Sequence, residues 1–248
     1  MKTCFHAFAM AQSMFCYIPS PFRVWDEEAR PKMMLFLPVV GLEIGLGWYA
    51  LAWLCGLLRL PALIAGLALC AYPYIVTGFL HLDGFMDVVD AVRSCRDQAR
   101  RLEILKDSHV GSFAVVGCVL LMLAGFACCA SGLGDYRVLI FIPAVSRCGS
   151  ALAVTALRPI SVSQYASQKF SKKQVVILFV ELICFLLAAA LLCGVSALAL
   201  VFGILGYGYA LRKGYRSLGG MNGDIAGYAL TVSELCSIAA CAVMGGIL

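Results

Sequence analysis

A short stretch dense in charge, residues 81–109, lies between two long apolar segments of this 248-residue chain. It carries six of the chain's 14 Asp and Glu residues and five of its 19 Lys and Arg residues. Ionic groups in this number cannot form a core between apolar segments, and membrane proteins keep them mainly where they handle ions or phosphates. The chemistry of the protein is therefore expected in this stretch.

Asp83, Asp87 and Asp90 follow one another at positions i, i+4 and i+7. On an α-helix their directions fall within about 60°, so the three carboxylates share one face. No basic residue lies between them, and carboxylates this close repel one another unless a cation lies among them. Mg²⁺ or Mn²⁺ is the expected ion, because it prefers carboxylate oxygens and a diphosphate can complete its coordination. The alternative is a solvated segment whose Arg and Asp neutralise each other, which suits Asp97 better than these three.

A second polar helix is expected directly afterwards. Glu103 and Asp107 stand at i and i+4, so a second carboxylate pair can face the first, with Asp107 as a further metal ligand. Arg100, Arg101 and Lys106 are positive groups suited to non-bridging phosphate oxygens. Carboxylates for a metal ion together with cations for phosphate are typical of phosphoryl transfer.

Four more positions are candidates for binding the substrate. His81 precedes the first aspartate and could assist phosphate binding. Arg147 falls within an apolar run, where a charge normally faces a polar cavity or a partner, although an arginine near the inner end can also reach the interface. Gly223 and Asp224 belong to the glycine-rich stretch 219–229, whose backbone N–H groups can hold phosphate; a plain turn explains these glycines equally well.

Membrane helices must position these residues. The chain is 62% hydrophobic and 13% charged, whereas soluble domains average about 45–50% and about 25%. We predict an all-α, polytopic membrane bundle, a single domain over 1–248 with about seven spans. The stretch 212–229 is expected to be a glycine-rich loop. The expected spans are 34–56, 61–80, 110–131, 138–157, 174–193, 196–211 and 230–247.

The basic residues predict the orientation of these spans. Of the 19 Lys and Arg, only Arg59 and Arg137 fall in loops on one side and Arg147 falls within a span, while the others lie on the opposite side. By the positive-inside rule, the N-terminus, the acidic stretch 81–109 and the loop 212–229 face the cytoplasm. This partition also accounts for the net charge of +5 without a nucleic-acid partner.

The N-terminus and the cysteines suggest only structural roles. The apolar patch from Phe5 to Tyr17 is expected to form an interfacial amphipathic helix, because the basic region and cleavage site of a signal peptide are not found there. Ten of the 13 cysteines lie in apolar runs, where they act as small hydrophobic side chains. No C-x-x-C pair occurs and the three His are scattered, so neither a zinc site nor disulfides are expected.

Several motifs resemble those of one known family. GFLHLDGFMDVVDA at 78–91 and RRLEILKDSHVGSF at 100–113 are similar to H-L-D-G-x-x-D-x-x-D-G and R-R-x-E-I-M-K-D-S-x-x-G-T-F-G of the cobalamin synthase, or adenosylcobinamide-GDP ribazoletransferase, family. FLPVVG at 36–41, Ser146-Arg147 and GGMNGD at 219–224 resemble its other motifs in order along the chain. Every carboxylate of these motifs is kept. The departures from the family pattern are Ala91, Leu105, Ser112, Ala114 and Asn222.

The resemblance implies the last assembly step of the cobalamin nucleotide loop, in a bacterial cytoplasmic membrane. Adenosylcobinamide-GDP would react with α-ribazole or its 5′-phosphate to give adenosylcobalamin or its 5′-phosphate and GMP. The three aspartates would then hold Mg²⁺ or Mn²⁺, the basic residues of 100–106 would hold phosphate oxygens, and Asp87 or Asp107 would accept the hydroxyl proton. Association with other cobalamin-assembly enzymes, or with further copies of this chain, stays open.

Two other classes of membrane protein remain as alternatives to this family. A CDP-alcohol phosphatidyltransferase also uses an Asp-rich membrane helix, but its pattern D-G-x-x-A-R is not matched, since Phe, Met and Asp follow Gly84. A cation-coupled transporter would use Glu43, Arg147 and Glu181 as intramembrane charges. Transporters place their acidic sites near the middle of the bilayer, whereas here the acids gather at a predicted boundary.

Overall fold

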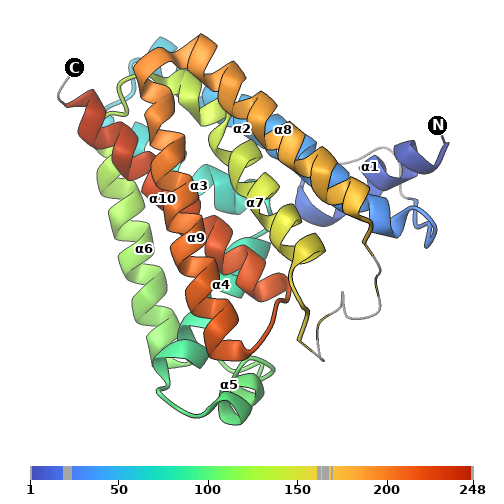
Figure 1. Ribbon diagram of the computed structural model, residues 1–248. Helices are drawn as coiled ribbons and strands as arrows, with labels where there is room; N and C mark the ends of the chain where they lie inside the picture. The colour runs from blue at the N-terminus through green and yellow to red at the C-terminus, as the bar shows by residue number, and fades with distance from the viewer. Residues whose placement is uncertain (1, 19–23, 161–162, 164–167, 169, 247–248) are drawn as a thin grey trace.

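The structure, a computed structural model, describes residues 2–18, 24–160, 163, 168 and 170–246, and these residues are helical throughout most of their length (Figure 1). The one β-type pairing among them is an isolated parallel bridge between Pro159 and Met221. The predicted all-α class is confirmed. The helices are α1 Lys2–Phe15, η1 Arg30–Lys32, α2 Met33–Leu57, α3 Ala62–Val76, α4 Leu80–Arg93, α5 Gln98–Ile104, α6 Ser112–Ala130, η2 Tyr136–Ile140, α7 Ile142–Ala156, α8 Lys172–Cys193, η3 Gly194–Ala197, α9 Leu198–Leu218 and α10 Gly223–Gly245.

Five helical stretches of the described chain are long and apolar enough to cross a membrane, and the count rises to six if the bent pair α3–α4 forms one span. A polytopic helical membrane bundle is therefore confirmed. The count is five or six against the predicted number of about seven, and it takes Lys172–Leu218 as one stretch although two helices, α8 and α9, make it up. The five stretches are Arg30–Leu57, Ser112–Ala130, Tyr136–Ala156, Lys172–Leu218 and Gly223–Gly245.

Two breaks in the helices account for the difference between this count of five or six and the predicted number of about seven. The predicted span 61–80 is interrupted, because α3 ends at Val76 and α4 leaves it at an angle of 89°. Gly78 and Phe79 make this bend with φ angles of 59° and 62°. The predicted spans 174–193 and 196–211 belong to one apolar stretch, in which η3 joins α8 to α9 at the top of Figure 1. Apolar composition indicates how much chain the membrane can hold, but it does not indicate where the chain turns.

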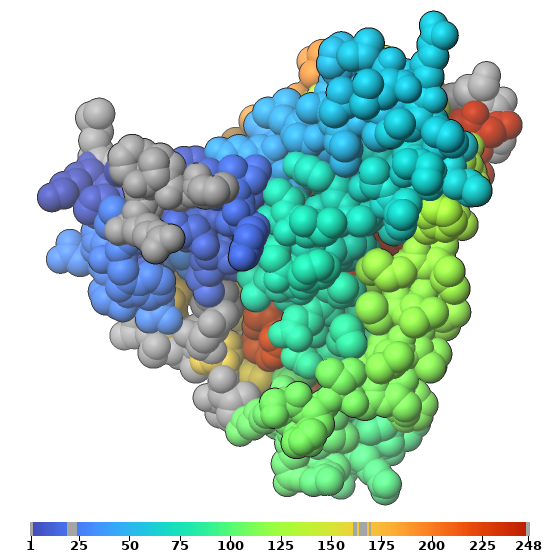
Figure 2. Space-filling model, turned by 180° about the vertical axis from the view of Figure 1, so that it is seen from behind, coloured from blue at the N-terminus to red at the C-terminus, as the bar shows by residue number. Residues whose placement is uncertain are grey.

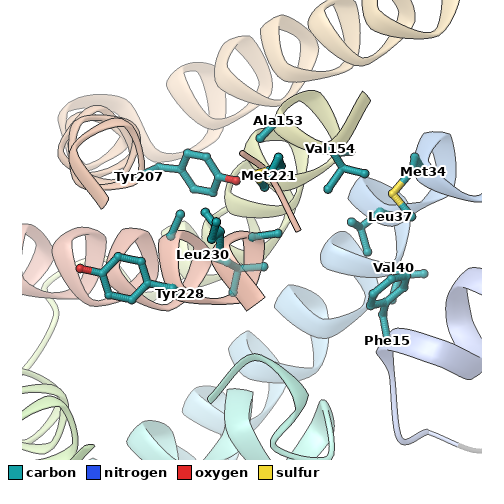
Figure 3. Close-up of a cluster of buried hydrophobic side chains, with 14 of the residues drawn as sticks. Phe15, Met34, Leu37, Val40, Ala153, Val154, Tyr207, Met221, Tyr228 and Leu230 are labelled. Atoms are coloured by element: carbon teal, nitrogen blue, oxygen red, sulfur yellow. The ribbon is translucent and has the colours of Figure 1, made fainter. Parts of the chain in front are cut away.

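Close helix contacts hold the bundle together. Gly41 and Gly45 lie one turn apart on α2, and a Cβ at either would come within 2.5 Å of a backbone oxygen of Pro143 or Ile140. The backbone of α2 therefore touches those of η2 and α7, as is common where small residues line membrane helix interfaces. Figure 3 shows part of the buried apolar cluster, in which side chains of α2, α7, α9 and α10 converge.

The predicted glycine-rich loop over 212–229 is wrong for most of its length. Helix α9 continues to Leu218 and α10 begins at Gly223, so only 219–222 are not helical. Asn222 explains the early start of α10, because its side chain accepts a hydrogen bond from the Ile225 N–H at 3.0 Å and caps the helix. Met221 fixes the turn, donating to the Arg158 carbonyl at 2.9 Å.

Candidate active site

The crossing of α4 and α10 brings together aspartates that are far apart in the sequence. Helix α4 packs on α10 and α6 through a buried face that includes Gly84, Phe85 and Val88. A Cβ at Gly84 would lie 2.9 Å from the Cα of Asp224, so the two backbones touch at this position. The close approach places Asp224, in the first turn of α10, against the polar side of α4.

We call Asp83, Asp87 and Asp224 the acidic face. Asp83 is exposed, and the other two are half-buried. The charges acting on the Asp87 carboxylate are those of Asp83, Asp224 and Asp90, and Asp83 also acts on Asp224. No ion pair in the described part of the chain includes a residue of the acidic face. Three carboxylates that repel one another without a neighbouring cation form a surface that attracts positive ions.

Asn222 orients one carboxylate of the acidic face. Its Nδ2 donates to Asp224 Oδ2 at 2.6 Å, while its Oδ1 caps α10. One side chain thus starts the helix and holds the carboxylate in its first turn. The sequence comparison with family motifs marked Asn222 only as a departure, so this role was not foreseen.

The Asp90 carboxylate contacts α6 rather than the acidic face. Its Oδ1 accepts a hydrogen bond from the Ala114 N–H at 3.3 Å, in the first turn of α6. A Cβ at Gly111 would overlap the same carboxylate, so the glycine leaves room for it. Asp90 therefore stabilises the N-terminus of α6, where a negative charge is favourable. Its predicted role as a metal ligand stays a prediction.

The expected second carboxylate pair does not form on one helix face. The predicted second helix forms as α5, with Asp97 as its cap, but it ends at Ile104, so only Glu103 is helical. Asp107 instead accepts hydrogen bonds from the backbone N–H of His109 at 3.0 Å and from its ring at 2.6 Å. The bond to the His109 ring lowers the pKa of Asp107. These bonds form a local turn at 107–109 in place of further helix. Short polar side chains such as Asp often end a helix in this way, because they hydrogen-bond to nearby backbone groups.

The three basic residues predicted to hold phosphate lie on α5 or just after it, and the two on α5 contact other groups of the protein. Arg100 forms an exposed ion pair with Glu103 at 2.5 Å, and Lys106 is exposed. Arg101 is half-buried, and its Nη1 donates to the Ser217 carbonyl at 3.5 Å. Gln98 donates to the neighbouring carbonyl of Leu218 at 3.1 Å. Helix α5 thus packs at the C-terminus of α9, at the bottom of Figure 1, where a positive charge is favourable.

Arg147 is fully buried in the bundle and paired with Glu234. Its Nη1 donates to Glu234 Oε1 at 2.8 Å and to the Pro143 carbonyl at 3.2 Å. The Ser146 hydroxyl donates to the same Glu234 oxygen at 3.0 Å. The sequence interpretation considered Arg147 for substrate binding and overlooked Glu234. An acidic residue within the last apolar span was a usable signal, because such residues normally have a partner.

A cavity of about 330 Å³ lies beside the acidic face. Three predicted substrate-binding residues, His81, Gly223 and Asp224, line it. His81 is 9% exposed, its ring stacks on Phe15 with centroids 6.3 Å apart, and its Nε2 has no hydrogen-bond partner in the described structure. Figure 2 shows red atoms of α10 at the base of a hollow bordered by the teal α3–α4 segment.

The carboxylates of the acidic face suit a metal ion that is also coordinated by a substrate. Within the described residues, no three His, Cys, Asp or Glu side chains converge closely enough to hold a metal ion by themselves. Mg²⁺ usually takes only one or two protein carboxylates and completes its octahedron with water and substrate phosphates. The acidic face fits this second kind of site. It can hold a divalent ion on a diphosphate next to a cavity for another reactant.

Comparison with known proteins points to one family. The family model for cobalamin-5-phosphate synthase matches residues 7–242. The chain is 40% identical to the adenosylcobinamide-GDP ribazoletransferase of Clostridium perfringens strain 13, over 96% of this chain and 98% of that protein. It is 34% identical to the protein of the same name from Clostridium botulinum strain Alaska E43, over 96% and 97%, and 33% identical to that of Brevibacillus brevis, over 92% and 94%. No solved structure matches the chain.

Proposed function

This chain belongs to the cobalamin-5-phosphate synthase family, and on that premise we propose that it joins adenosylcobinamide-GDP to α-ribazole or α-ribazole 5′-phosphate. The products are adenosylcobalamin or its 5′-phosphate, and GMP. The observation in the structure that supports this reaction best is the meeting of Asp83, Asp87 and Asp224, none of which forms an ion pair with a described residue. A diphosphate with its divalent ion supplies the charge that these residues lack.

The reaction is a phosphoryl transfer between two oxygen atoms. A ribose hydroxyl of α-ribazole attacks the phosphorus bonded to cobinamide and forms the new P–O bond, while the P–O bond to GMP breaks. The hydroxyl proton passes to a carboxylate. Asp87 is the better placed of the two predicted bases, because it lies on the acidic face, whereas Asp107 is exposed and bonded to His109.

Mg²⁺ or Mn²⁺ is proposed to bind at the acidic face through one or two of the carboxylates of Asp83, Asp87 and Asp224, together with the diphosphate of the substrate. When bound, the ion supplies positive charge that offsets the charge growing on the departing GMP. The residues of the chain hold this arrangement in place: Gly84 permits the close approach of α10, and Asn222 orients the Asp224 carboxylate. Phosphate binding by Arg100, Arg101 and Lys106 remains part of the proposal, since α5 follows α4 directly.

The enzyme is proposed to work at the cytoplasmic side of a bacterial cytoplasmic membrane. The spans expected from the sequence place most of the basic residues on one side of the membrane, and an excess of Lys and Arg is typical of the cytoplasmic side. GMP and nucleotide-activated substrates are also cytoplasmic compounds. Association with other enzymes of the same pathway, or self-association, is compatible with this placement.

The reaction and its ion requirement can be tested together. Purified protein in nanodiscs is incubated with adenosylcobinamide-GDP and α-ribazole or its 5′-phosphate, and the products are measured by mass spectrometry. Adenosylcobalamin and GMP are expected in equal amounts with Mg²⁺, and neither with EDTA. Folded protein that releases no GMP with either form of ribazole would overturn the proposed function.

The acidic face can be tested by one substitution. Asp87→Asn keeps the size of the side chain and removes its charge, so GMP release is expected to fall by about 100-fold or more. Glu28→Gln removes a charge from an exposed residue far from α4 in the sequence and serves as the control. Normal GMP release by a folded Asp87→Asn protein would contradict the role of Asp87.

A further inference from the structure

The cavity beside the acidic face has two chemically different sides. Its apolar wall comes from α1, α2 and α7 and includes Phe15, Met34, Leu37 and Val154, which Figure 3 shows clustering together. Its polar side comes from α4, α7 and α10. The polar lining residues include His81, Ser150, Asn222 and Asp224.

We propose that this cavity binds the acceptor nucleoside of the reaction, with the heteroaromatic base against the apolar wall and the ribose toward Asp224. The inference rests on the proposed function and adds to it the position of one substrate. It assigns a role to α1 as well, because Phe15 at the end of this helix forms part of the wall.

The size of the cavity favours a nucleoside. Its volume of about 330 Å³ is at the small end of the range of about 300–1,000 Å³ that is usual for ligand pockets. A base with one sugar fits a space of this size, whereas a corrin ring with its side chains does not. Adenosylcobinamide must therefore lie elsewhere, with its diphosphate reaching the acidic face.

The apolar wall suits the base of α-ribazole better than guanine. Guanine carries donors and acceptors on several edges, and each one buried without a partner costs about 1–3 kcal/mol. The wall of Phe15, Met34, Leu37 and Val154 offers no such partners. A benzimidazole nucleoside has only one ring nitrogen that accepts a hydrogen bond, and the rest of the base is apolar.

His81 supplies the matching donor. Its Nε2 is buried and has no partner in the described structure, which is uncommon for a polar atom in a folded protein. In the tautomer that carries hydrogen on Nε2, the ring donates one hydrogen bond. A base bound beside His81, on the polar side of the cavity, would give this buried donor its one acceptor.

Asp224 connects the cavity to the chemistry. It lines the cavity and also belongs to the acidic face, where it interacts with Asp83. A ribose that lies at this end of the cavity brings its hydroxyl next to the phosphorus of the other substrate. The nucleoside therefore lies with its base at His81 and its ribose at Asp224.

The test fills the cavity and measures each substrate separately. Val154→Phe is expected to raise the KM for α-ribazole at least tenfold and to leave the KM for adenosylcobinamide-GDP within twofold. The Kd for α-ribazole alone, measured with protein in nanodiscs without the second substrate, should rise to the same extent. Val145→Phe is the matched control, since it makes the same change on α7 in a different cavity of about 330 Å³.

A second variant keeps the test decisive if Val154→Phe does not fold. His81→Phe retains a ring against Phe15 and removes the donor, so the Kd for α-ribazole is expected to rise about tenfold. A folded variant with unchanged α-ribazole binding would overturn the proposal, as would a selective rise in the KM for adenosylcobinamide-GDP or weaker inhibition by GMP. Failure of the proposed function is a separate result, namely wild-type protein that makes no GMP.

Discussion

Arg147 illustrates how a single buried charge is paired within the bundle, through its Nη1 alone, since its Nε and Nη2 have no partner among the described residues. An arginine in an apolar run could serve a substrate or a structural partner. Its ion pair with Glu234 supports the structural partner, because it joins α7 to α10, while its bond to the Pro143 carbonyl lies within α7. Since the side chain is fully buried, a substrate would have to displace these contacts to reach it.

The arginine pair makes a prediction about stability. Arg147→Met leaves the Glu234 carboxylate buried without its partner, so the free energy of unfolding should fall by about 3–5 kcal/mol. The double variant Arg147→Met/Glu234→Leu removes both charges and should recover most of this loss. Unfolding followed by denaturant in detergent micelles measures both effects. An Arg147→Met protein that is as stable as the wild type but has a raised KM for adenosylcobinamide-GDP would instead show that Arg147 binds the substrate.

At the scale of elements, the site depends on how closely α4 and α10 cross. Each helix carries part of the acidic face, and neither holds the whole of it. Gly84 allows the contact, because any Cβ there would lie 2.9 Å from the Asp224 Cα. Phe85 and Tyr228 add a stacked pair at the same interface, with ring centroids 5.7 Å apart.

The crossing predicts opposite effects for two glycine substitutions. Gly84→Ala should force α4 and α10 apart, reducing stability by about 1–3 kcal/mol and lowering GMP release. Gly208→Ala is the control on α9, where a Cβ meets no atom within 4 Å. Alanine favours a helix by about 0.5–1 kcal/mol over glycine, so this variant should be as stable as the wild type or slightly more so. Thermal unfolding and GMP release in parallel test the prediction, and equal behaviour of the two variants would refute it.

At the scale of the molecule, α6 separates the segment before it from the segment after it by about the thickness of a bilayer core. Helix α6 is 19 residues long and rises about 1.5 Å per residue, so it spans about 28 Å, close to the thickness of a bilayer core. Helix α5 precedes it at the bottom of Figure 1, and the turn at 131–135 follows it at the top. If α6 crosses the membrane, these two segments lie on opposite sides.

The orientation of the bundle is testable with inserted epitopes. An epitope after Arg96, next to α5, is expected to react with antibody only in inside-out vesicles. An epitope after Gly132, where a side chain would meet no atom within 4 Å, should react only in intact spheroplasts. GMP release by each tagged protein shows that it is folded. The reverse pattern would place the acidic face outside the cytoplasm and contradict the proposed localisation.

Composition and short-range spacing determined the class of the protein and half of its site. Apolar content alone predicts a helical membrane bundle, because only structures that satisfy their own backbone hydrogen bonds can cross a bilayer. The i, i+4, i+7 spacing places Asp83 and Asp87 on one side of α4, because helix geometry fixes the direction of residues one turn apart. The motifs of 78–113 likewise resembled the family that the comparisons confirm.

The tertiary structure alone decided which distant residues meet. Asp224 joins Asp83 and Asp87 because α10 crosses α4 at Gly84, and Arg147 pairs with Glu234, 87 positions away. Asp90 is drawn to the start of α6, and α5 packs at the end of α9. Spacing along one helix cannot reveal these contacts, because they depend on the angles and depths at which separate helices pack.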